Sequence, residues 1–155
     1  MDRRGAYARL RELQARGRAL LGVDYAILGG AMTWVSERNL VAAISNAGGF
    51  GVLACGSMTP DLLRAEIRAT RERTSKPFGV NLIVMHPALA ELIEVCGEEK
   101  VGCVVLAGGI PPRTAMRRVK ELGAVLIGFA PALGIARKLV RDGVDALIIE
   151  GTEAG

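Results

Sequence analysis

The regular alternation of short apolar runs with amphipathic segments is the feature of this sequence that most restricts its fold. Each gap between successive runs has room for one helix. The runs are almost continuous in Val, Ile, Leu and Ala, as expected of parallel strands that are buried on both faces. The alternation therefore predicts right-handed strand–helix–strand crossovers and a parallel sheet covered by helices. The predicted strands are Tyr25–Leu28, Gly51–Ala54, Phe78–Ile83, Gly102–Leu106, Val125–Ile127 and Ala146–Ile149.

The segments between these runs carry signals of helix ends. Thr59 followed by Pro60 places a capping residue and then a proline at the first helical position. Glycines that can adopt a left-handed conformation follow three segments, at Gly48, Gly123 and Gly143. The last segment is amphipathic, with an apolar stripe made of Ala132, Ile135, Ala136, Leu139 and Val140.

Two α/β folds fit this pattern. One is an open doubly wound sheet, and the other is a (β/α)₈ TIM barrel that stops after about six of its eight strands. The pattern of runs does not separate the two. A length of 155 residues fits one domain, with residues 1–22 as a leading helix and linker and residues 23–155 holding strands one to six.

The net charge of +4 comes from the leading segment. Residues 1–20 hold six Arg against Asp2 and Glu12, and the remaining residues are balanced in charge. We interpret this segment as a solvated helix face rather than a transit peptide, because its leucines lead directly into the first strand. A basic patch spread over the domain, which would indicate nucleic acid, is absent from the sequence.

The three cysteines predict reduced, buried thiols in a cytoplasmic protein. Cys55, Cys96 and Cys103 are odd in number, lack a C-x-x-C spacing and stand in apolar stretches. We therefore expect no metal site. No apolar run reaches the length of a membrane span, so we expect no membrane association.

One dinucleotide-type motif and one histidine invite a functional interpretation that their context does not favour. The segment Gly49–Ala54 matches G-x-G-x-x-A, but it follows a predicted helix at 40–47 and leads into a strand, the reverse of the order in a dinucleotide site. His86 is the only histidine, and it precedes Pro87 at the start of a helix. A capping or exposed histidine is the ordinary case at such a position, although any histidine base within this chain must be His86.

Two polar residues at strand ends are better candidates. Asn81 lies within an apolar strand, where asparagine is depleted, and it serves either a ligand or a structural hydrogen bond. Glu150 follows the sixth apolar run, where a carboxylate could contact cofactor hydroxyls, handle protons or cap a helix. In α/β folds, ligands bind at the carboxyl ends of the strands, where both residues are placed.

Several segments, in order and with matching spacing, resemble the nitronate monooxygenases, formerly called 2-nitropropane dioxygenases. The similarity covers about residues 8–155 and favours the barrel over the open sheet. The segments that carry it are Ile27–Val35, Ser45–Gly51, Lys76–Leu82, Gly143–Ala146 and Ile149–Gly155. Three positions depart from the family pattern: Ala26 stands for a common proline, Gly29 for a common glutamine, and Phe129 for a flavin-facing lysine of some members.

The resemblance implies an FMN-dependent oxidoreductase. Ala31, Met32 and Thr33 would lie against the flavin through their backbone, and Asn81 would hydrogen-bond the ring system. Glu150 would approach the flavin from the sixth strand. The cofactor-binding set that it implies is Ala31, Met32, Thr33, Asn81, Phe129, Glu150 and Gly155.

The same resemblance places the catalytic base outside the chain. In the family, Glu-Ala-Gly is followed by a glycine and the catalytic histidine, which here would lie just beyond Gly155. No catalytic residue is therefore assigned. The phosphate-binding loops after strands seven and eight would also lie outside, so we expect a low affinity for FMN.

Three functions remain open from the sequence. The first is oxidation of alkyl nitronates by O₂ through FMN, and the second is a flavin-dependent enoyl-acyl-carrier-protein reductase that uses NAD(P)H. The third is an inactive truncated fragment, produced by a natural truncation or a gene model. For the chain expressed alone, we expect a flavin-free protein that is poorly soluble or forms homo-oligomers through open sheet edges.

Overall fold

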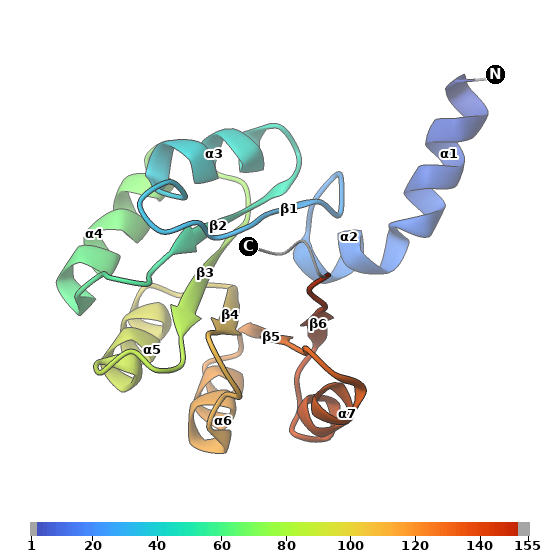
Figure 1. The fold of residues 1–155 in the computed structure, drawn as a ribbon. Helices are drawn as coiled ribbons and strands as arrows, with labels where there is room; N and C mark the ends of the chain where they lie inside the picture. The colour runs from blue at the N-terminus through green and yellow to red at the C-terminus, as the bar shows by residue number, and fades with distance from the viewer. Residues whose placement is uncertain (1–2, 152–155) are drawn as a thin grey trace.

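A six-stranded parallel sheet surrounded by helices makes up the described part of the chain, residues 3–151, in the computed structural model (Figure 1). The strands are β1 (Leu28–Gly29), β2 (Phe50–Ala54), β3 (Phe78–Ile83), β4 (Cys103–Ala107), β5 (Val125–Phe129) and β6 (Ala146–Ile148). The helices are α1 (Arg3–Leu13), α2 (Ala15–Leu21), α3 (Arg38–Asn46), α4 (Pro60–Arg71), α5 (Leu89–Glu98), α6 (Arg113–Glu121) and α7 (Leu133–Arg141).

The order of the strands distinguishes between the two predicted folds. The strands follow one another across the sheet in chain order, from β1 to β6, and each neighbouring pair is parallel. A doubly wound sheet reverses its order at a switch point, and this sheet does not. Helices α3 to α7 lie in an arc outside the strands (Figure 1). The structure therefore confirms the prediction of a (β/α) barrel, of which the described residues contain six strands.

Alternate residues of the strands face two separate apolar clusters. Val80 and Leu82 of β3 pack outward among the helices, in the larger cluster. Phe50 of β2 and Val105 of β4 pack inward, where Leu21 of α2 joins them. Gly79 is required on the inner side, because a Cβ there would lie 2.9 Å from the Phe50 ring. Period-two alternation thus separates the helix-facing core from the inside of the arc.

The predicted helix ends are confirmed. The hydroxyl of Thr59 accepts a hydrogen bond from the Leu62 N–H at 3.3 Å, and Pro60 is the first residue of α4. Gly48, Gly123 and Gly143 have φ values of 90°, 77° and 96°, the left-handed region that glycine adopts without steric cost. The G-x-G-x-x-A segment forms a turn and then β2, as its context predicts.

Two expectations about the edges of the fold are wrong. The first strand is Leu28–Gly29 rather than Tyr25–Leu28, and Ile27 is 59% exposed. The strand lies at an edge of the sheet and pairs only with β2, so its apolar run is not buried on both faces. Ala132 and Val140 do not belong to the buried stripe of α7: Ala132 is exposed and precedes the helix, and Val140 is 58% exposed while Leu139 is fully buried. Among the described residues, no helix follows α7.

The leading segment forms two helices rather than one. Helix α1 projects away from the rest of the molecule, whereas α2 lies beside the open side of the arc (Figure 1). Gly22 ends α2 in a left-handed conformation and donates its N–H to the carbonyl of Arg18. Among the described residues, no helix combines the length and the apolar character that crossing a membrane requires.

Candidate functional site

A cavity of about 720 Å³ lies at the carboxyl ends of the strands, on the inner side of the arc. It is formed by residues that end or follow five of the six strands, so the barrel wall itself sets its shape. Ligands bind at this end of parallel α/β sheets. The lining residues are Leu28, Gly30, Ala31, Val52, Asn81, Ile83, Val105, Ala107, Gly108, Gly109, Ile110, Phe129, Pro131, Ile148 and Glu150.

Asn81 is the polar group placed deepest in this lining. It lies in β3 in register with Ala54 of β2 and Val105 of β4, and it is 7% exposed. Its strand neighbours Val80 and Leu82 pack outward, so Asn81 faces the cavity. No described residue forms a hydrogen bond with its side-chain amide. The amide is not enclosed by the protein but reaches the cavity, so this side chain is available to a ligand.

Four of the residues predicted to hold the cofactor meet at this cavity. Ala31 follows β1, Asn81 lies in β3, Phe129 ends β5, and Glu150 follows β6. The two strands β1 and β6 stand at opposite edges of the sheet, so the fold brings together residues that are far apart in the chain. Glu150 is exposed and is the one charged residue among the lining residues that the structure describes.

The remaining predicted residues lie elsewhere. Met32 and Thr33 are exposed in the loop after β1 and do not line the cavity. Gly155 lies outside the described residues.

His86 is in the loop after β3, and its Nδ1 accepts a hydrogen bond from the Ala88 N–H at 3.1 Å, just before α5. Its side chain thus bonds the backbone of the loop before α5, and it is not among the residues that line the cavity.

Sequence reasoning missed the loop that follows β4. Gly108 and Gly109 both line the cavity and have φ values of 79° and 136°, which residues with a side chain rarely adopt. A Cβ at Gly108 would lie 2.9 Å from the side chain of Ile83. The pair of glycines directly after an apolar strand was the available signal.

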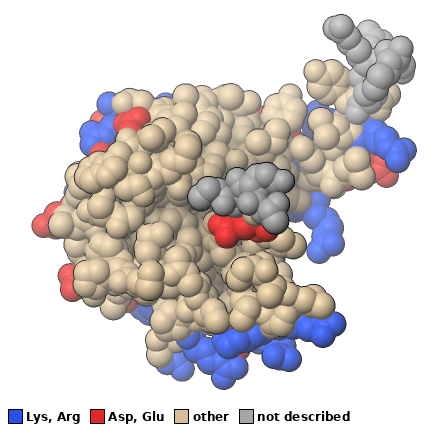
Figure 2. Space-filling view, in the orientation of Figure 1, with Lys and Arg blue, Asp and Glu red and all other residues tan. Residues whose placement is uncertain are grey.

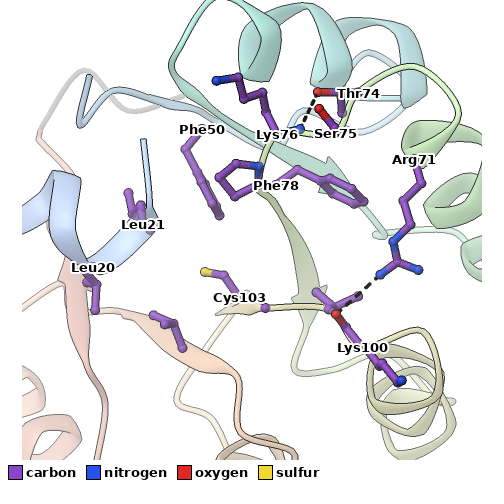
Figure 3. A pocket seen from close by; sticks show the side chains of 14 residues that line it. Leu20, Leu21, Phe50, Arg71, Thr74, Ser75, Lys76, Phe78, Lys100 and Cys103 are labelled. Atoms are coloured by element: carbon purple, nitrogen blue, oxygen red, sulfur yellow. Dashed lines mark hydrogen bonds between the residues drawn. The ribbon is translucent and has the colours of Figure 1, made fainter. Parts of the chain in front are cut away.

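A second hollow of about 580 Å³ lies at the opposite, amino-terminal ends of the strands. Its floor is apolar, with Phe50 and Phe78, and the ends of Lys76 and Lys100 point away from these rings (Figure 3). The Thr74 hydroxyl is already bonded to the Asn46 amide oxygen at 2.6 Å. Thr74 is thus engaged and the two lysines are turned outward, and the cavity at the carboxyl ends is the better candidate for a site.

Charged side chains are distributed unevenly over the surface. Lys and Arg gather over α6 and α7 at one edge of the face that Figure 2 shows, while most of the middle of that face is uncharged. Two of the basic residues at this edge pair with carboxylates beyond their own helix: Arg113 of α6 with Asp142 after α7, and Lys120 of α6 with Asp145 before β6. No Lys or Arg is among the described residues that line the cavity.

Comparison with known proteins identifies relatives of this fold. A family model described as nitronate monooxygenase matches residues 15–100. The chain is 38% identical, over 88% of its length, to (3aS,4S,5R,7aS)-5-hydroxy-7a-methyl-1-oxo-octahydro-1H-indene-4-carboxyl-CoA dehydrogenase from Mycobacterium tuberculosis. It is 31% identical, over the same share, to a nitronate monooxygenase from Paraburkholderia phytofirmans. The structure of FabK from Thermotoga maritima superimposes with a TM-score of 0.85 at 42% identity and covers 88% of the chain.

The chain spans less than half of each of these relatives. It corresponds to 38% of the dehydrogenase, 48% of the nitronate monooxygenase and 43% of FabK. The matched region contains β1 to β3 and the cavity residues of these strands. The chain therefore belongs to the nitronate monooxygenase family.

Proposed function

We propose that the cavity at the carboxyl ends of the strands holds the ring system of FMN, in an oxidoreductase that oxidises alkyl nitronates with O₂. The observation that carries this proposal is Asn81, a buried amide that faces an apolar cavity and has no hydrogen-bond partner among the described residues. The ring system of FMN is flat and largely apolar, with polar atoms along one edge. It therefore matches an apolar lining that contains the Asn81 amide. FMN would supply the transfer of electrons between substrate and O₂.

The protein residues around the cavity would orient the ring and exclude water from it. The Asn81 amide has both a donor and an acceptor and can pair with either kind of polar atom at the ring edge. Val105 of β4 and Phe129 of β5 offer apolar contacts, and Gly108 and Gly109 let the backbone approach closely. Glu150 is the one ionisable group at hand to accept hydrogen bonds from hydroxyl groups of the cofactor or to hold a proton.

The lining also fits the low FMN affinity expected from the sequence. No Lys or Arg is among the described residues that line the cavity, and Glu150 adds a negative charge. Nothing there favours a phosphate group electrostatically. The proposal therefore predicts that residues 1–155 bind FMN no more tightly than lumiflavin, which has the same ring and no phosphate.

A second candidate function is redox chemistry on an acyl thioester. The chain is 42% identical to FabK, an enoyl-acyl-carrier-protein reductase, and 38% identical to the carboxyl-CoA dehydrogenase. It is 31% identical to the nitronate monooxygenase from Paraburkholderia phytofirmans. The higher identities favour a thioester substrate, with NAD(P)H as the reductant in the case of an enoyl group.

The test combines binding and turnover on one preparation. FMN and lumiflavin are titrated into the chain, and O₂ uptake with an alkyl nitronate is compared with NAD(P)H oxidation by an enoyl thioester. Nitronate-dependent O₂ uptake supports the first candidate, and thioester-dependent NAD(P)H oxidation replaces it with the second. Flavin binding without either turnover supports binding of the ring by these residues and rejects both activities for them. Failure to bind either flavin overturns the proposal.

A further inference from the structure

The loop between β1 and α3 is held by one buried hydroxyl group. Ser36 is 3% exposed, and its Oγ donates to the carbonyl of Gly30 at 2.8 Å and accepts from the N–H of Met32 at 2.9 Å. The hydroxyl thus joins the two residues that flank Ala31, which lines the cavity. Both of its bonds go to backbone groups, so the conformation of the loop depends on this side chain and not on neighbouring side chains.

Backbone bonds connect the same serine to the sheet. The N–H of Ser36 donates to the carbonyl of Met32 at 2.8 Å, and the carbonyl of Ser36 accepts from the N–H of Ala54 at 3.0 Å. Ala54 is the last residue of β2. The loop is therefore fixed at two points, to the end of a core strand and to its own first residues.

The loop between β1 and α3 contains one residue, Trp34, with a strained backbone conformation. Trp34 has φ of 66°, a left-handed conformation that is an outlier for a bulky side chain. Its side chain is 80% exposed, so packing does not offset the strain. Strain of this kind persists only where the surrounding structure fixes the backbone, and such sites cluster at ligand-binding positions.

We propose that Ser36 is a positioning residue, which holds the backbone on both sides of Ala31 and so sets Ala31 at the edge of the cavity in the conformation that meets the flavin ring. This inference rests on the proposed function for the identity of the ligand. Loss of the hydroxyl leaves the Gly30 carbonyl and the Met32 N–H without their hydrogen-bond partner. The loop then loses the conformation in which the backbone of Trp34 is left-handed. The effect on the ligand passes through the loop and not through contact with Ser36.

Ser45 provides a matched control at the other end of the sheet. It is 1% exposed, and its hydroxyl likewise donates to a carbonyl, that of Pro77 at 3.0 Å, and accepts from a backbone N–H, that of Gly51 at 3.3 Å. It lies outside the cavity at the carboxyl ends. A purely structural serine and a positioning serine can therefore be compared by the same substitution to alanine.

The experiment uses two measurements on Ser36→Ala, Ser36→Thr and Ser45→Ala. The first is the dissociation constant for lumiflavin. The second is the fluorescence anisotropy of Trp34 before flavin is added, which reports the loop alone because the chain has a single tryptophan. Ser36→Ala should weaken lumiflavin binding about tenfold and lower the anisotropy of Trp34. Ser36→Thr, which keeps the hydroxyl, should restore both, and Ser45→Ala should change neither.

Each other outcome rejects a specific part of the proposal. Equal binding by Ser36→Ala and the wild type overturns it, as does an equal loss in Ser45→Ala. If Ser36→Ala does not fold, Ser36→Cys replaces it, since a thiol keeps the volume but hydrogen-bonds weakly. If the wild-type chain binds no flavin, the proposed function fails. The anisotropy of Trp34 then still decides whether Ser36 holds the loop, and an unchanged value rejects that as well.

Discussion

Asn81 illustrates a residue whose side chain contributes little to folding. Its amide faces the cavity and has no hydrogen-bond partner among the described residues, so it adds no hydrogen bond within the protein to the folded state. Replacing it by an apolar side chain therefore removes no such bond and adds apolar contact at the cavity wall. Proteins retain such residues where a ligand supplies the missing partner, at the expense of stability.

We therefore expect Asn81→Leu to unfold at the same or a higher urea concentration than the wild type, with a gain in unfolding free energy of up to about 1 kcal/mol. The same variant should lose measurable flavin binding. Ser45→Ala, which removes a buried side chain with two backbone partners, should instead lose about 1–3 kcal/mol. A large loss of stability in Asn81→Leu would show that the amide has a structural role.

The three cysteines are a second prediction at the level of single residues. Burial raises the pKa of Cys55, Cys96 and Cys103 to about 12 in each case. Almost no thiolate is then present at pH 8, and the thiolate is the reactive form. A disulfide reagent added at pH 8 should label none of them in the native chain and all three after denaturation. Rapid labelling of any cysteine in the native state would contradict this assignment.

Among the helices, α6 and α7 are joined by one carboxylate. Asp142, at the end of α7, accepts hydrogen bonds from Arg113 of α6 at 2.6 Å and from Lys138 at 2.7 Å. The hydrogen bond from Arg113 is the main cause that lowers the pKa of Asp142 to about 2, and Lys138 adds to it. The link between the helices therefore depends on an ionised carboxylate.

The pH dependence follows from this lowered pKa. An unfolded aspartate has a pKa of about 3.9, so the stabilisation by Asp142 is complete above about pH 4 and is lost as the pH falls towards 2. The unfolding free energy of the wild type should fall more steeply over that window than that of Asp142→Asn. Asp61→Asn, at an exposed position with no ion pair among the described residues, is the control. Parallel curves for the wild type and Asp142→Asn would contradict the assignment.

Most helices and strands could be predicted, because the residues within each element determine where it begins and ends. The bounds of β2 to β6 differ from the predicted runs by at most two residues. Of these strands, β2 to β5 lie between two neighbours and β6 lies at an edge. The errors lie at β1 and at Val140, where the outcome depends on what stands beside an element and not on its own sequence. The residue pattern of an element does not show which other elements pack beside it.

The site was predicted less completely than the fold. Asn81 and Glu150 could be found because polar residues at strand ends are unusual. Gly108, Gly109 and Ile110 were missed, because glycine and isoleucine carry no chemistry that marks a site. Ser36 was missed for a related reason: a serine in a loop is common, and its importance depends on hydrogen bonds that only the folded backbone creates.

At the scale of the whole molecule, the sheet has two edges. The strand order does not close, so β1 and β6 each have one unpaired side among the described residues. Open edges favour association between chains. Ile149, directly after β6, is 78% exposed and adds an apolar side chain to this edge.

Ile149→Lys should therefore reduce association measured by sedimentation velocity as the protein concentration is raised. Leu62→Lys is the matched control, because it adds the same charge at an exposed apolar position of α4, which packs between α3 and α5. Association that is unchanged in Ile149→Lys, or equally reduced in both variants, would argue against assembly through the edge of β6.

The central claim is that the flavin ring binds at the carboxyl ends of the strands. The most direct test is a titration of the ¹⁵N-labelled chain with lumiflavin, followed by two-dimensional NMR of its amide groups. We predict that signals of Ala31, the Asn81 side chain, Gly108 and Gly109 shift together, while those of Thr74–Lys76 at the opposite hollow stay unchanged. Shifts confined to Thr74–Lys76, or no shifts at saturating lumiflavin, would contradict the claim.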